Sequence, residues 1–179
     1  MAVEPGSMRW YLVAFIVLIV AVIAPLIVRI AVHVDEPTVE IVNLDGTSRE
    51  VSLSMMRRMQ MLKREGTYQN QFENWRDQGT YTGVRLTDLI GTAGDYRSIR
   101  AIATDGYELS IGRERVEDPN YPMILAFAFD GVEVPAWKMG FRIAVLPEDG
   151  AVSNAEYDAI SAGSFWVQNV VKIILQAEP

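Results

Sequence analysis

The sequence predicts a β-rich α+β domain that follows a single membrane-spanning helix. Many short stretches alternate apolar and polar residues and are separated by glycine-bearing turns, which is typical of strands. Only two or three short segments have helical spacing, and strands and helices do not alternate regularly, which favours an α+β arrangement. Residues 10–28 form a long apolar run without a charged residue. These observations divide the chain into a short tail at 1–9, a transmembrane helix at 10–34 and a domain at 35–179.

The apolar run at 10–28, "WYLVAFIVLIVAVIAPLIV", predicts the membrane helix by its length. At about 1.5 Å per residue it would span roughly 28 Å, close to the hydrocarbon thickness of a bilayer. A buried soluble helix would show a polar stripe, a cleaved signal peptide a small-residue cleavage site, and a lipoprotein anchor a cysteine. The run shows no polar stripe, no convincing cleavage site follows it, and the chain has no cysteine. We therefore expect a single-pass protein of the cell membrane, with a short cytoplasmic tail and the domain on the external side.

Charge and cysteine content exclude several functions. Without Arg9, Arg29 and Glu4, residues 35–179 contain 14 basic and 22 acidic side chains, a net charge of −8. This acidic balance disfavours nucleic acid and anionic lipid surfaces as partners. The absence of cysteine excludes disulfides, thiolate metal ligands and a cysteine nucleophile. The only histidine, His33, lies at the predicted membrane edge, so one chain cannot form a Ser-His-Asp triad or a histidine metal cluster.

The first half of the domain is expected to begin with a β-hairpin, because alternating apolar residues flank the turn pair Asp45 and Gly46. A helix capped by Ser52 or Ser54 is expected next, with its methionines assigned to the core in preference to a partner surface. The expected elements after the hairpin are a helix at 55–66, a strand at 66–74, a polar loop at 76–83 and a short helix closed by glycine at 84–94.

The second half is expected to consist mainly of strands. Two hairpins are predicted, each around an Asp-Gly pair, at residues 105–106 and 130–131. The expected strands are 98–105, 107–112, 123–130, 132–137, 141–147 and 165–175, with a loop that contains a helical turn at 148–164.

Four runs of the domain, taken in order, define a pattern: "QFENWRDQGTYTGVRLTDLI", "ATDGYELS", "ILAFAFDGVEV" and "MGFRIAVLP". In the first run Tyr81 follows Trp75 by six positions and precedes a glycine and a leucine-bearing helix. This order of motifs resembles the molybdopterin-binding domain of the sulfite-oxidase-like oxidoreductases, and the resemblance extends over residues 38–175. It implies the fold of that family.

The same resemblance implies a molybdenum ion held by the pterin dithiolene and by one cysteine thiolate, four residues before Trp75. Gln71 stands at that position in this sequence. Its amide is a neutral, hard donor and cannot replace an anionic, soft thiolate. Phe141 replaces the family's usual proline, whereas Arg142 stands at the position of the family's arginine. No cofactor is therefore expected, and a retained molybdopterin is the alternative.

We expect a membrane-anchored, oxidoreductase-like domain of the molybdopterin-binding fold that lacks molybdenum catalysis, a pseudoenzyme that acts as a ligand-binding or accessory module. Its partner would be a small polar or anionic ligand, or another membrane protein. In a surviving pocket Gln71 would hydrogen-bond the ligand, tyrosines would line the walls, and Arg142 would receive an anionic group. The candidate pocket residues are Gln71, Asn74, Tyr81, Asp105, Tyr107 and Arg142.

Three other interpretations remain open. The chain could be a molybdopterin-dependent oxidoreductase that passes electrons to a membrane partner. It could be a structural interaction protein of the cell envelope. Trp75, Tyr81 and Tyr107 could also be ordinary core aromatics, with Arg142 a strand residue paired with a surface carboxylate. The geometry around Gln71 is expected to separate a polar pocket from a packed core.

Overall fold

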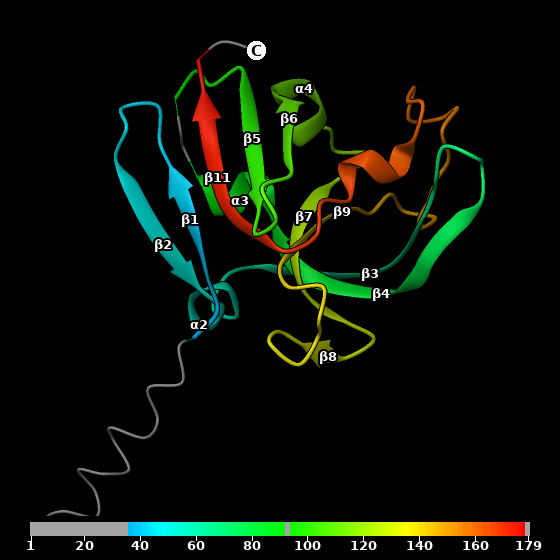
Figure 1. Ribbon diagram of the computed structural model, residues 1–179, viewed down its shortest axis with the longest axis horizontal. Helices are drawn as coiled ribbons and strands as arrows, with labels where there is room; N and C mark the ends of the chain where they lie inside the picture. The colour runs from blue at the N-terminus through cyan, green and yellow to red at the C-terminus, as the bar shows by residue number, and fades with distance from the viewer. Residues whose placement is uncertain (1–35, 92–93, 178–179) are drawn as a thin grey trace, which may run out of the picture. The chain divides into compact units, whose positions relative to one another are not determined.

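The structure is a computed structural model that describes residues 36–91 and 94–177 (Figure 1). The predicted tail at 1–9 and transmembrane helix at 10–34 lie outside the described residues. Within the described ranges, no helix combines the length and the apolar character needed to cross a membrane. The described residues from Pro37 onward form one unit.

One sheet contains five strands in the order β2, β1, β11, β5 and β6 (Figure 1). Their bounds are β1 (Thr38–Val42), β2 (Ser48–Ser52), β5 (Ser98–Ala103), β6 (Glu108–Gly112) and β11 (Val170–Gln176). The pairs β1–β2 and β5–β6 confirm two of the predicted hairpins. Gly46 and Gly106 in their turns have φ angles of 81° and 84°, a conformation that glycine adopts without a Cβ clash. Strand β11 joins the hairpins, because it pairs parallel with β1 and antiparallel with β5.

The second sheet runs in the order β10, β3, β4, β7 and β8, and β9 also pairs with β7. Its strands are β3 (Met61–Gln69), β4 (Trp75–Arg85), β7 (Met123–Phe129), β8 (Val132–Glu133), β9 (Arg142–Val145) and β10 (Ala151–Val152). Every residue of β7 except the last is buried, as expected of its continuous apolar run. The helices are short: α2 (Leu53–Met56), α3 (Leu86–Ile90), α4 (Arg113–Val116) and the 3-10 helix η1 (Ala162–Phe165).

One contiguous apolar core draws residues from both sheets. Ile41, Ile99 and Ile173 come from the first sheet, Leu125 and Ile143 come from the second, and all five are completely buried. Burial of an aliphatic side chain of this size stabilises the fold by roughly 1.5–3 kcal/mol. This shared core packs the two sheets together and supports the loops that connect their strands.

The helix predicted at 55–66 is wrong beyond its first turn. Ser52 caps α2 through a hydrogen bond from the N–H of Met55, but α2 ends at Met56. From Met61 the chain is strand β3, and its side chains alternate in exposure because it pairs with β4. Long-range pairing thus overrides local helix propensity. The methionines are expected in the core in preference to an exposed surface, and they occupy both environments: Met56 is buried, whereas Met55 and Met61 are exposed.

The polar loop predicted at 76–83 is also wrong, because these residues belong to strand β4. Two glycines caused the misassignment, yet each allows a close approach within the sheet. A Cβ on Gly83 would lie 2.3 Å from the carbonyl oxygen of Leu125, and a Cβ on Gly79 would lie 2.4 Å from the ring of Phe129. Glycine is needed here for packing and not for a turn. The turn itself lies between β3 and β4, inside the strand predicted at 66–74.

Candidate functional site

The six candidate pocket residues lie in three different places. Tyr81 and Arg142 are buried side chains of the second sheet. The pair Asp105 and Tyr107 is exposed at the turn between β5 and β6, and the pair Gln71 and Asn74 is exposed at the turn between β3 and β4. The structure therefore does not gather all six around one hollow: Gln71 lines one hollow, and Asp105 with Tyr107 lines another.

Arg142 is the charged residue buried most deeply in the described chain. Strand β9 places it opposite Ala126 of β7, and its side chain is only 2% exposed. Its guanidinium lies 2.7 Å from the carboxylate of Asp77, which is 36% exposed. The same guanidinium donates a hydrogen bond of 3.2 Å to the hydroxyl of Tyr68. A buried cation requires such a counter-charge, since its desolvation is otherwise costly.

Three aromatic rings enclose the guanidinium. Its central carbon lies 5.4 Å from the ring centre of Trp166, 5.6 Å from that of Tyr68 and 6.0 Å from that of Tyr81. These distances are within the range of cation–π attraction. The rings also contact each other, with the Trp166 ring centre 4.9 Å from Tyr68 and 5.0 Å from Tyr81. We call Arg142, Asp77, Tyr68, Tyr81 and Trp166 the Arg142 cluster.

Both tyrosines of the cluster hold Asp77 in place. Tyr68 donates a hydrogen bond of 3.0 Å to the Asp77 carboxylate, and Tyr81 donates one of 2.7 Å to the Asp77 carbonyl oxygen. Asp77 has a φ angle of 50°, a conformation that these contacts must maintain. Burial raises the pKa of Tyr68 and of Tyr81 above the ordinary value of 10.0, so both hydroxyls stay protonated and able to donate at neutral pH.

Among the described residues, the Arg142 cluster leaves its guanidinium with no free charge and no open space to offer a ligand. The positive charge is balanced by Asp77, and the rings occupy the space around the guanidinium. Its Nε atom is buried without a hydrogen-bond partner among the described residues. An anionic ligand would have to displace Asp77 before it could pair with Arg142.

A hollow of about 280 Å³ lies beside the turn between β5 and β6. Asp105 and Tyr107 line it, together with the rings of Tyr68 and Trp166 and the polar side chains of Ser164, Gln168 and Asn169. Asp105 accepts a hydrogen bond of 3.0 Å from the N–H of Tyr107. Asp105 is the only charged residue among those that line this hollow. The hollow can thus receive a polar group, whereas its one charge would repel an anion.

The turn between β3 and β4, at residues 70–74, presents Gln71 and Asn74 to solvent at the far side of the described domain from the start of β1 (Figure 1). The side chain of Asn70 organises this turn, because its oxygen accepts the N–H groups of Phe72 and Asn74 at 2.9 and 3.1 Å. Phe72 is 72% exposed, and Trp75 is exposed beside it. Ile160, which lines the same hollow as Gln71, is 91% exposed. We call Phe72, Trp75 and Ile160 the hairpin-tip patch.

Asn154 fastens the neighbouring loop to this hairpin. Its side-chain amide donates to the carbonyl oxygen of Asn70 at 2.9 Å, and its side-chain oxygen accepts the N–H of Ala162 at 2.8 Å. Its backbone N–H donates to the Gln69 side chain at 2.9 Å. These hydrogen bonds hold the segments that carry the hairpin-tip patch in a defined conformation.

Three members of the Arg142 cluster are not identifiable as site residues from the sequence. Tyr68 and Trp166 fall in expected strands, and Asp77 falls in an expected polar loop. The alternation of aromatic and polar residues around Tyr68 and Tyr81 was a usable signal for a strand pair. No local signal identifies Asp77, because its partner Arg142 is distant in the sequence and its backbone conformation depends on the fold.

The described domain consists of two β-sheets around one shared core, with only short helices. This architecture agrees with the β-rich class predicted from the sequence. No family model matches the chain, and no curated protein matches it. Among solved structures, the chain is similar to the sulfane dehydrogenase SoxCD from Paracoccus pantotrophus, with 16% identity and a TM-score of 0.57. The similarity covers 79% of this chain and 38% of that chain. It supports a distant sulfite-oxidase-like fold.

The described residues do not fit a molybdenum–pterin cofactor. The chain has no cysteine to supply a thiolate, and Gln71 is exposed in a different place from Arg142. Within the described ranges, no group of three or more histidine, cysteine or acidic residues is placed to hold a metal ion. The donor set therefore disagrees with the cofactor that the resemblance implies.

Proposed function

We propose that this chain is a membrane-anchored accessory or ligand-binding module, built on a sulfite-oxidase-like fold without molybdenum redox chemistry. The helix predicted at 10–34 anchors it in the cell membrane, and the domain lies on the external side. One observation supports the proposal above the others: Asp77 neutralises Arg142 inside a cluster of aromatic rings. Because its charge is already paired inside the domain, Arg142 is not free to receive an anionic substrate.

Metal and pterin analysis of the full chain tests the loss of redox chemistry. The protein is expressed in a host that makes the cofactor and is purified in detergent, beside a cofactor-loaded enzyme of the sulfite-oxidase-like class as a loading control. We expect neither molybdenum nor fluorescent pterin oxidation products in the test protein. Near-stoichiometric molybdenum would overturn the proposal and favour an oxidoreductase that passes electrons to a membrane partner.

The hollow beside Asp105 supports the ligand-binding form of this function. Aromatic walls and neutral polar groups fit a small polar ligand, and the single carboxylate favours a neutral or cationic one. Small polar compounds can be screened by ligand-observed NMR against the full chain and against Asp105→Asn. Binders of the wild-type chain that bind the variant equally well would place the ligand elsewhere.

The hairpin-tip patch favours a second candidate, a structural interaction protein of the cell envelope. Large apolar side chains on a preorganised scaffold bind partners with little loss of conformational entropy. A photo-crosslinking residue at Trp75 should then give one discrete adduct in cells, and Ile160→Ser with Phe72→Ser should abolish it. The same crosslinker at Val132, which is exposed on β8, is the matched control. Equal adducts at Trp75 and Val132 would argue against a specific interface.

A further inference from the structure

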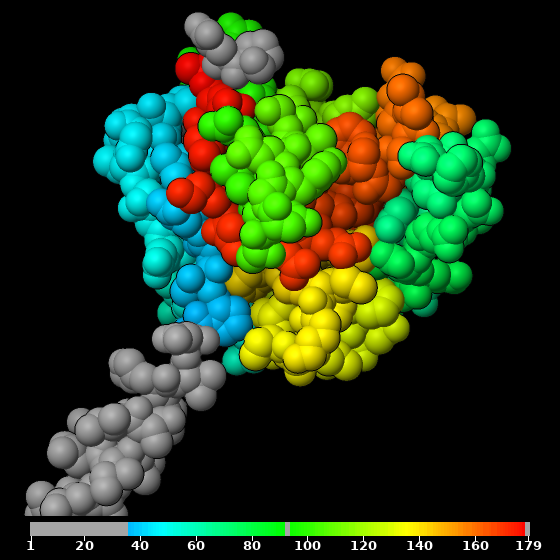
Figure 2. Space-filling view, in the orientation of Figure 1, coloured from blue at the N-terminus to red at the C-terminus, as the bar shows by residue number. Residues whose placement is uncertain are grey.

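An apolar groove lies where the described chain begins. Its volume is about 310 Å³, and its lining is more apolar than that of the hollow beside Asp105. Pro37 contributes to one wall, Pro135 and Lys138 from the segment after β8 contribute to another, and Val171 of β11 completes it. The carbonyl oxygen of Pro37 accepts the N–H of Leu53 at 3.0 Å, so α2 supports this point of the chain. Figure 2 shows residues near the start of β1 beside the segment around β8.

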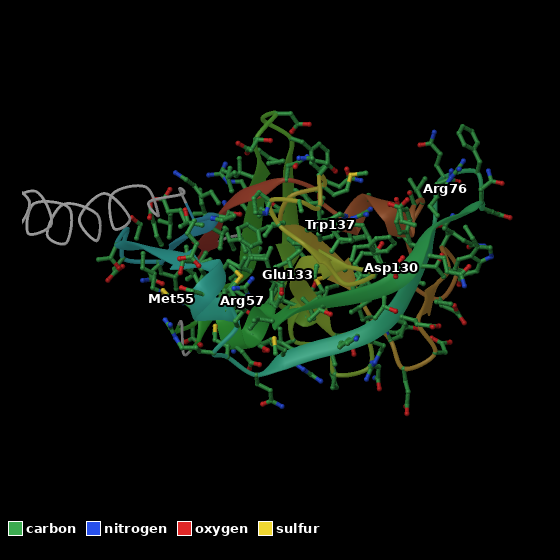
Figure 3. All side chains as sticks on the ribbon, turned by 90° about the horizontal axis from the view of Figure 1, so that it is seen from below. Met55, Arg57, Arg76, Asp130, Glu133 and Trp137 are labelled. Carbon is green, nitrogen blue, oxygen red and sulfur yellow. The ribbon has the colours of Figure 1, made fainter. Side chains whose placement is uncertain are left out.

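Exposed apolar side chains and one basic side chain, Lys138, lie in or directly next to the segments that line this groove. Met139 follows Lys138 and is 40% exposed, and Val171 is 39% exposed. Arg57, directly after α2, forms an ion pair with Glu133 of β8, and the two lie side by side in Figure 3. This pair ties α2 to the segment that bears Lys138. We call Pro37, Pro135, Lys138, Met139 and Val171 the Pro37 face.

The length of chain before Pro37 limits what can cover this face. The helix predicted from the sequence ends at residue 34, three residues before Pro37. Three extended residues span at most about 11 Å. The headgroup layer on each side of a bilayer is roughly 5–7 Å thick. A membrane that holds residues 10–34 therefore lies within reach of the Pro37 face.

We propose that the Pro37 face docks on the lipid bilayer, with Met139 and Val171 at the boundary of headgroups and acyl chains and Lys138 among the headgroup phosphates. The proposal rests on the membrane anchor of the proposed function. Lysine suits this position because its alkyl stem packs on apolar surface while its ammonium stays in the polar layer. Tethering at Pro37 keeps the face at a high effective concentration near lipid, so a small contact area suffices. The domain then has one fixed orientation, with the hairpin-tip patch directed away from the bilayer.

The chain contains no cysteine, so single-cysteine labelling needs no background substitutions. Full-length Met139→Cys and Val171→Cys are labelled with an environment-sensitive fluorophore and reconstituted into vesicles of zwitterionic phosphatidylcholine. Ile160→Cys and Phe72→Cys are matched controls, because both are exposed apolar residues of the hairpin tip. Spin-labelled phosphatidylcholine then serves as a quencher. We expect a several-fold larger loss of fluorescence at positions 139 and 171 than at positions 160 and 72.

Each other outcome overturns a stated part of the proposal. Vesicle-associated protein with equal, weak quenching at all four positions would refute docking of the face and leave the anchor intact. Blue-shifted emission at 139 and 171 without lipid quenching would show that the chain's own residues 29–35 cover the groove, which also refutes docking on lipid. Protein that is removed from the vesicles by an alkaline carbonate wash would refute the anchor and the docking together. None of these readouts depends on molybdenum or pterin content.

Discussion

The carboxylate of Asp77 lies 2.7 Å from the guanidinium of Arg142 and joins β4 to β9 through the interior of the domain. Arg142 is only 2% exposed, whereas Asp77 is 36% exposed, so the pair places its cation inside and its anion at the boundary with water. The hydroxyl of Tyr68 bonds to both partners. This arrangement makes Arg142 a part of the folded core.

Removal of the Asp77 charge should destabilise the domain. Asp77→Asn keeps a side chain that tolerates positive φ, but it leaves the Arg142 cation without a counter-charge. We expect the free energy of unfolding to fall by about 3 kcal/mol. This value is at the lower end of the cost of breaking a buried ion pair, because water reaches Asp77. Urea unfolding of the full chain in detergent, followed by near-ultraviolet circular dichroism, measures it.

The double variant Asp77→Asn with Arg142→Met is the control for that prediction. It removes both charges, so most of the lost stability should return. A double variant as unstable as Asp77→Asn alone would mean that the cluster stabilises through packing of the guanidinium and not through charge balance.

Alkaline pH should destabilise the domain through its buried tyrosines. Burial raises the pKa of Tyr157 from 10.0 to about 12, so the folded state holds a proton that the unfolded state releases. The associated stability is complete below pH 10.0 and is lost as pH rises through about 12. Tyr68, Tyr81 and Tyr96 shift in the same direction, mainly because of burial.

Tyr157→Phe tests this pH dependence. The Tyr157 hydroxyl is buried without a hydrogen-bond partner among the described residues, so its removal should leave stability at neutral pH unchanged or slightly higher. The fall in the free energy of unfolding above pH 10.0 should become shallower. An unchanged alkaline slope in urea titrations would assign the effect to other tyrosines.

Asn154→Ala should loosen the support of the hairpin-tip patch. It deletes two side-chain hydrogen bonds, to Asn70 and Ala162, and leaves their backbone groups partly buried. We expect a cost of about 2 kcal/mol and faster amide hydrogen exchange at residues 70–74 and 160–165. Asn120→Ala, at an exposed position elsewhere, should change neither. Unchanged exchange in Asn154→Ala would show that packing alone holds the loop.

Gln71→Cys should fail to restore a cofactor. The substitution introduces a thiolate donor at the position that the resemblance indicates, but Asp77 and the Tyr68 ring still occupy the space around the Arg142 guanidinium. Molybdenum measured by mass spectrometry after expression in a cofactor-competent host should stay at the wild-type background. Stoichiometric metal in this variant would show that one residue alone separates the chain from molybdenum binding.

Local sequence patterns predicted the parts of the fold that depend only on residues close in the sequence. The hairpins around Gly46 and Gly106 follow from Asp-Gly pairs between alternating strands, and the short helix α3 follows from apolar spacing closed by Gly91. The β3–β4 hairpin was missed because Gly79 and Gly83 look like loop residues in the sequence. Only the folded structure shows why glycine is needed at these two positions, because Phe129 and Leu125 of β7 lie directly against them.

The sequence by itself predicted a membrane helix, and it determined the acidic charge, the absence of a thiolate and the β-rich class, because these depend on composition and on short-range periodicity. Tertiary structure alone decided that Arg142 is paired with Asp77, that Tyr107 and Trp75 are exposed, and that Gln71 lies in a different place from Arg142 and Asp105. A side chain's surroundings are set by segments far apart in the chain. Of the residues first proposed for one pocket, the fold therefore places two in its core, two at a hollow and two at a hairpin tip.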